Sequence, residues 1–212
     1  MTTYALNPAE AKQAEYTGSR IDETGKYIGK FLYAEDILAQ SGTAGVEFHF
    51  ETKDGRKCRT TIYTVKADGT ALSGRNILMA IMACLKVRGL EAVPGRITKY
   101  DYDAKADVQR DAKVFKELHG KDIGLLLQAE EYAKQDGSGT GWKMIIAGCF
   151  EAATELTASE ILDKKTKPEQ LARMVMALKD KPLKTGSARP AATGSAPKGA
   201  GRFDDMDDDI PF

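Results

Sequence analysis

One segment near the middle of the chain constrains the fold more than any other. Apolar and polar side chains alternate from residue 46 to residue 51, in the order Val-Glu-Phe-His-Phe-Glu. This period of two is typical of a β-strand with one buried face. The dipeptide Asp54-Gly55 follows and favours a two-residue hairpin turn. Residues 56–66 continue with β-branched and aromatic side chains, so a β-hairpin is predicted here.

The rest of the body shows further strand and helix patterns. Strand-like composition marks residues 26–34, 123–132 and 142–150, and apolar residues at helical spacing mark 75–87. Residues 90–120 are polar and show no clear period. Three strands, a helix and two strands are the order of an OB-fold, a small five-stranded Greek-key barrel. The sequence therefore predicts a mainly β (α+β) fold of this kind, with an open five-stranded sheet covered by the helix as the alternative.

Two helices are predicted at the end of the body. Thr157-x-x-Glu160 is a capping-box pattern that opens a helix over 158–163. Thr166-x-x-Glu169 opens another, predicted to run to about Lys181. From 183 the chain is rich in Gly, Ala, Ser and Pro and is predicted to be disordered. The expected organisation is a domain over 1–182, a disordered linker over 183–203 and an acidic tip over 204–212.

The charges of the chain balance overall but are segregated along it. There are 31 basic and 31 acidic residues in all, and residues 203–212 hold five aspartates and no base. The body is close to neutral, so a nucleic-acid site has to be a local patch. No apolar run reaches membrane-spanning length, and the first residues carry no secretory signal. Three widely spaced cysteines fit a reducing compartment, so a cytoplasmic protein is expected.

The predicted hairpin carries the best candidate patch. Lys53, Arg56, Lys57 and Arg59 fall within seven residues around the turn, against one acid, Asp54. On the second strand the alternation places Arg59 and Tyr63 on one face. A cation beside an aromatic ring is what single-strand binding needs, because rings stack on bases and cations neutralise phosphates. The alternative is a solvated basic hairpin with Tyr63 half inside the core.

Other aromatic residues are candidates for base stacking. Tyr27, Phe31 and Tyr33 alternate along the first strand and are predicted to share a face, either stacking on bases or lying in the core. Trp142 stands beside Lys143 after the glycine-rich segment 134–141. We expect this Trp either to stack on a base or to pack at the rim of the sheet.

The chain ends in Asp207-Asp208-Asp209-Ile210-Pro211-Phe212, which has the chemistry of a captured peptide. A basic-rimmed apolar pocket can hold the Phe212 ring together with its terminal carboxylate, while the aspartates steer the tip toward basic surfaces. A tail that serves only solubility is the alternative. The six residues match the usual ending of bacterial single-stranded DNA-binding proteins. This resemblance implies that the tip recruits host replication and repair proteins.

The body departs from the usual sequence of that bacterial family and resembles phage-encoded single-stranded DNA-binding proteins instead. The resemblance lies in four stretches, residues 4–8, 78–85, 124–128 and 156–161. It implies an OB-type fold that coats single-stranded DNA during phage replication, recombination or repair. It implies no catalytic residue, no cofactor and no metal, and it leaves open the tetramer of the bacterial family, so a homo-oligomer is one expectation.

Two rival functions stay open on the sequence. The first is an adaptor or decoy that binds tip-reading proteins and no DNA, which a near-neutral body permits. The second is a metal-dependent nuclease that uses the aspartates of the unassigned segment, Asp101, Asp103, Asp107 and Asp111. Lysine and arginine residues are interleaved with these four, which favours a solvated loop over a metal site. The segment Gly137–Gly141 lacks the Gly-Lys-Ser/Thr of a phosphate-binding loop.

Overall fold

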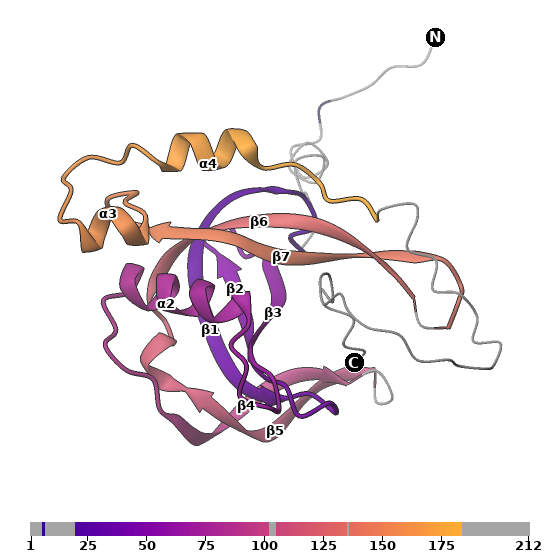
Figure 1. The fold of residues 1–212 in the computed structure, drawn as a ribbon. Helices are drawn as coiled ribbons and strands as arrows, with labels where there is room; N and C mark the ends of the chain where they lie inside the picture. Colours follow the sequence, from indigo (N-terminus) through magenta and orange to yellow (C-terminus); the bar gives the residue numbers. More distant parts are fainter. Residues whose placement is uncertain (1–5, 7–19, 102–104, 135, 184–212) are drawn as a thin grey trace, which may run out of the picture.

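The computed structural model describes residues 6, 20–101, 105–134 and 136–183. The acidic tip and nearly all of the predicted linker lie outside these residues. Within them the chain forms one seven-stranded antiparallel sheet with three α-helices (Figure 1). The prediction of a mainly β fold is confirmed.

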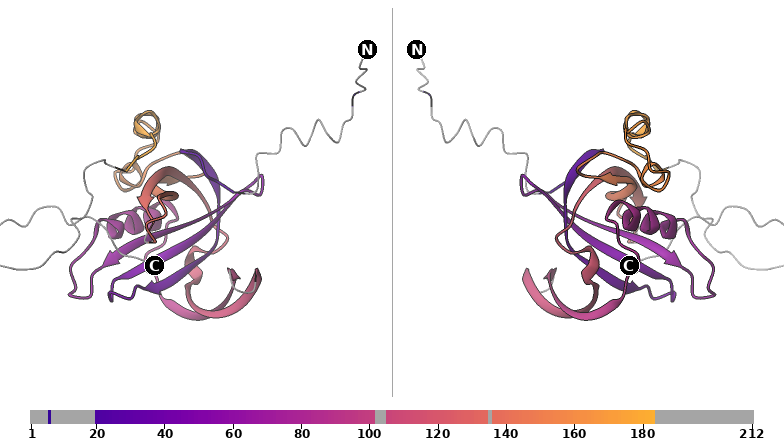
Figure 2. Two further views of the ribbon diagram at one scale, coloured as in Figure 1. Left: turned by 90° about the vertical axis from the view of Figure 1, so that its right-hand side faces the viewer. Right: turned by 90° about the vertical axis from the view of Figure 1, so that its left-hand side faces the viewer.

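Strand β1 (Gly25–Leu38) organises the sheet because it pairs along both edges. One edge pairs with β2 (Ala44–Thr52) from Gly29 to Leu38. The other edge pairs first with β6 (Asp122–Ala133), from Gly25 to Lys30, and then with β5 (Ala106–Phe115) at Glu35. The three neighbours are arranged around β1 in a curved sheet, as Figure 2 shows.

The predicted hairpin at Asp54-Gly55 is confirmed, and the strand-like segments 123–132 and 142–150 form a second hairpin. Strand β2 turns through Asp54-Gly55 into β3 (Lys57–Val65), where Gly55 adopts a φ of 85° that favours glycine. The second hairpin joins β6 to β7 (Thr140–Glu151) around the glycine-rich segment. In β3 alternate residues enter the core, as the sequence period requires, whereas β6 is buried on both faces from Ile123 to Leu127.

The polar stretch 90–120 forms a third hairpin, so the prediction of five strands is wrong. It holds β4 (Ala92–Asp101), β5 and the short 3₁₀ helix η1 (Lys116–Leu118). Most of β5 is solvent-exposed, which explains why its sequence shows no alternation of apolar and polar residues. The β4–β5 pair arches away at one side of the sheet (Figure 2).

The sheet is not closed into a barrel. Strands β3 and β7 contact each other, but no ladder joins them in the described part of the chain. Helix α2 (Ser73–Cys84) packs on both strands. It begins against the β3 backbone, where Gly74 leaves no room for a side chain: a Cβ there would lie 2.2 Å from the Tyr63 carbonyl oxygen. The helix therefore covers the seam that the strands leave unpaired.

The last two helices are tied together by one buried carboxylate. Helix α3 (Ala158–Leu162) opens with the predicted capping box, in which Glu160 accepts a hydrogen bond from the Thr157 amide. The same carboxylate accepts hydrogen bonds from the amides of Glu169 and Gln170, just before α4 (Leu171–Ala177). The Thr157 bond, followed by these others, outweighs burial and holds the pKa of Glu160 at about 2.

Helix α4 is shorter than predicted: it begins at Leu171 rather than near Thr166, and contacts with β6 explain why it ends early. The sequence pattern favoured a helix to about Lys181, but the chain becomes extended at Leu178. From there it runs beside β6, where the Lys181 amide donates to the Ala129 carbonyl and the Glu131 amide to the Lys181 carbonyl. These long-range hydrogen bonds replace the helical ones and cannot be recognised from local propensity.

The main core lies between the curved sheet and α2. Its centre holds three phenylalanines, with the Phe31 ring centroid 4.7 Å from that of Phe48 and 6.0 Å from that of Phe50. A second cluster joins Leu126 and Phe150 on the opposite face of the β6–β7 hairpin to Leu171 of α4. Helix α4 thus covers that face.

Substitution at Gly124 should test this second cluster. A Cβ on Gly124 would lie 2.1 Å from the Phe150 ring, which is fully buried and cannot retreat without disturbing its neighbours. We expect Gly124→Ala to lower the free energy of unfolding by about 1–3 kcal/mol in urea titrations, through overpacking.

Gly89→Ala is the matched control, since a Cβ there meets nothing within 4 Å. Equal stability of the two variants would contradict the packing of Phe150 against Gly124.

Candidate nucleic-acid interface

The turn between β2 and β3 presents the predicted cluster of bases. Lys53 and Lys57 are exposed and Arg56 is half-buried. Arg56 Nε lies 2.7 Å from an Asp54 carboxylate oxygen, and Lys57 Nζ lies 3.7 Å from one of Glu51. Lys53 makes no ion pair with any described residue, so its charge is available to an anionic ligand.

The predicted face of β3 is confirmed. Cys58 and Ile62 enter the core, while Arg59, Thr61 and Tyr63 lie on the outer side. Arg59 is exposed and sits opposite His49 of β2, and Tyr63 sits opposite Gly45. A Cβ on Gly45 would lie 3.0 Å from the Tyr63 ring, so the ring lies over this glycine. A cation and an aromatic ring therefore do share the outer face.

A β-bulge overturns the prediction that Tyr33 shares a face with Tyr27 and Phe31. The β1–β2 register shifts between Phe31, which pairs with Phe50, and Tyr33, which pairs with His49. The extra residue reverses the alternation of faces. Phe31 stays in the core, while Tyr33 moves to the outer side and joins a separate cluster with Ile97 and Val114.

The Tyr33 ring is only 8% exposed on that outer side. It stacks on His49 with ring centroids 4.0 Å apart, and its hydroxyl donates to the Thr98 carbonyl. Burial, followed by the charges of Glu47 and Glu35, raises the pKa of Tyr33 above its ordinary value. In this structure the ring is enclosed and does not present a surface to a base.

Two buried carboxylates on the outer face hold the β4–β5 hairpin over it. Lys99 of β4 places its Nζ 2.6 Å from a Glu47 oxygen and 3.5 Å from a Glu35 oxygen. Arg110 of β5 pairs with Glu35, and Arg59 Nε lies 3.8 Å from Glu47. Lys99 and Arg110 could not be recognised from the sequence as members of this site, because only the fold brings their hairpin onto β1 and β2.

His49 completes this network. Its Nε2 lies 2.9 Å from the Tyr33 hydroxyl and 3.2 Å from a Glu47 oxygen. The carboxylate can only accept, and the Tyr33 proton is directed to Thr98, so Nε2–H is the donor to both. Burial opposes the ionisation of Glu47, but its bonds to His49 and Lys99 and the charge of Arg59 outweigh it. They hold its pKa at about 2.

The remaining predicted aromatics lie away from the Arg59–Tyr63 face. Tyr27 is half-buried, donates to the Glu23 carbonyl and has the Arg56 guanidinium 5.4 Å from its ring centre. Trp142 is 49% exposed near the start of β7, opposite Glu131 of β6. Its neighbour Lys143 places its Nζ 3.1 Å from Glu130. The predicted residues thus fall into three groups: the β2–β3 turn with Tyr27, the outer face, and the β6–β7 end.

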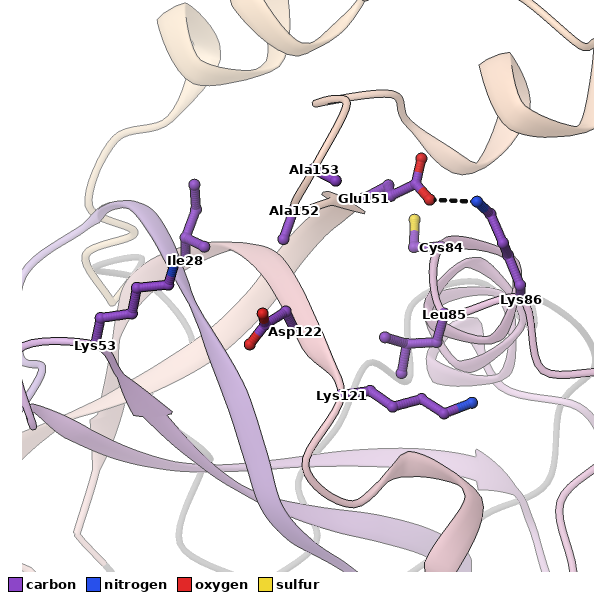
Figure 3. A pocket seen from close by; sticks show the side chains of 10 residues that line it. All are labelled: Ile28, Lys53, Cys84, Leu85, Lys86, Lys121, Asp122, Glu151, Ala152 and Ala153. Atoms are coloured by element: carbon purple, nitrogen blue, oxygen red, sulfur yellow. Dashed lines mark ion pairs between the residues drawn. The ribbon is translucent and has the colours of Figure 1, made fainter.

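A cavity of about 440 Å³ opens beside the turn (Figure 3). Its lining includes apolar Ile28 and Leu85 and the exposed cations Lys53 and Lys121, while Lys86 pairs with Glu151 at 2.7 Å. A second hollow of about 360 Å³ shares Lys53 and Asp122 with it. Lys121 is distant from the hairpin along the chain, so its place beside the same cavity as Lys53 could not be recognised from the sequence.

The aspartates proposed for metal binding lie along the β4–β5 hairpin, apart from Asp103, which is outside the described residues. Asp107 and Asp111 belong to β5, and Asp111 pairs with Arg96 at 3.5 Å. Among the described residues no group of three or more His, Cys, Asp or Glu side chains is arranged to hold a metal ion. None of the helices described is long and apolar enough to cross a membrane.

No protein-family model matches this chain, and no curated protein is significantly similar to it.

The Glu47 network makes a pH-dependent prediction. The pKa of Glu47 is about 2 in the folded chain and near 4.5 without these contacts. The stability that ionised Glu47 contributes is therefore complete above about pH 4.5 and disappears as the pH falls toward 2. We expect Glu47→Gln to lower the free energy of unfolding at pH 7, because Arg59 and Lys99 lose the charge of their Glu47 partner. The expected loss is about 1–3 kcal/mol, since both cations keep some solvent contact that weakens the ion pairs.

The difference between Glu47→Gln and the unsubstituted protein should shrink between pH 4.5 and pH 2, as followed by denaturant titrations at each pH. Glu91→Gln is the control, since Glu91 is exposed and forms no ion pair with a described residue of this network. A difference that stays constant with pH would show that Glu47 is not held ionised by these cations.

Proposed function

We propose that this chain is a non-enzymatic single-stranded DNA-binding protein of bacteriophage replication, recombination or repair, acting in the cytoplasm of the host. The observation that carries the proposal is the outer face of β3, where exposed Arg59 lies on the same side as Tyr63 and continues into the basic β2–β3 turn. Cations there neutralise phosphates, and a ring beside them stacks on a base regardless of its identity.

The connectivity supports an OB-type ancestry for this binding face. Strand β1 pairs with β2 and β6, β6 pairs with β7, and α2 comes between the two sets and packs on β3 and β7. Apart from the missing β3–β7 pairing and the added β4–β5 hairpin, this is the plan of a five-stranded OB barrel, whose sheet face binds oligonucleotides. We therefore propose an open, OB-derived barrel with one inserted hairpin.

The second part of the proposal concerns the acidic end. The six residues Asp207 to Phe212 match the tip by which bacterial single-stranded DNA-binding proteins are bound by other proteins. We propose that the tip brings host replication and repair proteins to the strand that the body holds. An adaptor that has the tip but binds no DNA is the alternative, and the first experiment below separates the two.

The body should bind oligo-dT more tightly than duplex DNA at low ionic strength, with an affinity that falls as salt is added. Arg59→Ala should weaken binding several-fold and reduce the slope of log affinity against log salt by about one. Tyr63→Ala should weaken it about 5- to 100-fold through lost stacking. Fluorescence anisotropy across a salt series measures all of these.

Arg173→Ala is the matched control, because it removes an exposed arginine from α4 on a different face of the molecule. Thermal melts verify that each variant is folded. Wild-type affinity in both Arg59→Ala and Tyr63→Ala would remove this face from the site. Failure of the unsubstituted protein to bind oligo-dT at low salt would leave the adaptor function.

Deletion of residues 204–212 should separate the two parts of the function. We expect affinity for oligo-dT to stay equal or rise slightly, because an acidic segment is repelled by phosphates and competes for basic surfaces. Capture of host replication and repair proteins should be lost. A chain with the same nine residues in scrambled order is the control, because it keeps the charge of the tip and changes only its sequence. A large loss of DNA affinity on deletion would contradict the proposal.

A further inference from the structure

Two cysteine side chains from distant parts of the chain meet inside the core. Cys84 lies in the last turn of α2 and Cys149 lies in β7, 65 positions later. Their sulfur atoms are 3.8 Å apart, and both side chains are buried. The third cysteine, Cys58, is on β3 and does not share this contact. The fold thus singles out one pair of thiols from the three.

One member of the pair borders a cavity. Cys84 lines the 440 Å³ cavity beside Leu85 and Lys86, and Figure 3 shows its sulfur among the side chains that surround the opening. Contact with Cys149 lowers the pKa of Cys84, whereas burial raises the pKa of Cys58 to about 12. Because thiolates are the reactive form, Cys84 is the thiol best placed to react first.

The position of the pair matters for the sheet. Helix α2 covers the seam where β3 and β7 contact each other without a ladder, and Cys149 belongs to one of those two strands. The contact between helix and strand is noncovalent in the reduced protein. A bond between the two sulfurs would attach the covering helix to the edge of the sheet.

We propose that Cys84 and Cys149 are an oxidation site, at which a peroxide converts the two thiols into a disulfide that links α2 to β7. The Cys84 thiolate attacks one peroxide oxygen, the O–O bond breaks, and hydroxide leaves and takes up a proton to form water. The Cys149 sulfur then attacks the resulting sulfenic acid, an S–S bond forms, and a second water leaves with the Cys149 proton. Two thiols are oxidised and one peroxide is reduced to two waters.

The geometry is close to what the product needs. The sulfur atoms are already in contact at 3.8 Å and must approach to about 2.05 Å to form the bond. The disulfide would close a loop of 65 positions and reduce the freedom of the unfolded chain. We expect the oxidised protein to melt about 5–10 °C higher than the reduced one.

The test uses the full-length reduced protein, hydrogen peroxide as the probe and catalase as the quench. Thiol titration in denaturant should fall from three thiols to one, and peptide mapping should show Cys84 joined to Cys149 within one chain, 2 Da lighter than the separate thiol peptides. Dithiothreitol should restore three thiols and the lower melting temperature. None of these measurements involves DNA, so they stand whether or not the chain binds it.

Variants separate the pair from the third thiol. Cys58→Ser should still form the link, while Cys84→Ser and Cys149→Ser should show no rise in melting temperature after peroxide. Retention of three thiols by the unsubstituted protein, a link that includes Cys58, or links only between chains would each overturn the proposal. The map of the unsubstituted protein decides the matter even where a serine variant does not fold.

Discussion

The sheet depends on how β1 distributes its hydrogen bonds. One edge pairs with β2, but the other is shared by β6 near its start and β5 near its end. The bulge between Phe31 and Tyr33 lies where one neighbour gives way to the other. A bulge adds local twist and lets a strand bend, so β6 and β5 leave in different directions. The placement of Phe31 in the core and of Tyr33 on the outer face follows from this irregularity.

The same bulge decides which side chains become polar partners. It turns Tyr33 and Glu35 outward beside His49 and Glu47, so two carboxylates are buried on a face that would otherwise be open. Buried charges are costly unless they are paired. Lys99 and Arg110 supply the pairing and fix the β4–β5 hairpin in place. The hairpin has only one ladder position with β1, so these ion pairs and the burial of Ile97 and Val114 against Tyr33 hold it in place.

A nearly neutral chain can still present local positive charge when its carboxylates are occupied elsewhere. Glu35 and Glu47 are neutralised within the outer face, while Lys53 at the turn and Lys121 at the cavity form no ion pairs with described residues. The overall composition averages the acidic and basic parts of the chain, so its net charge of zero does not reveal this local positive charge. Lys53 thus adds an unpaired charge to the proposed nucleic-acid surface, whose other cations, Arg56, Lys57 and Arg59, each also lie near a carboxylate.

Elements with strong local signals could be predicted closely. The alternation before Asp54-Gly55 identified the β2–β3 hairpin and the faces of Arg59 and Cys58, and the Thr157–Glu160 pattern identified the start of α3. The β4–β5 hairpin was missed because its exposed strand carries no apolar period. The end of α4 was predicted too late because its hydrogen bonds are replaced by contacts with β6. Tyr33 was assigned to the wrong face because a bulge leaves no mark in the sequence period.

The sequence by itself determined the β-rich class, the basic turn and the chemistry of the acidic end, because each is written in a few adjacent residues. Tertiary structure alone decided that Tyr33 is enclosed, that Lys99 and Arg110 cover Glu35 and Glu47, and that Cys84 meets Cys149. These contacts join segments distant in the chain, and their energies depend on burial and distance. Burial and distance between such segments are set only when the strands have paired.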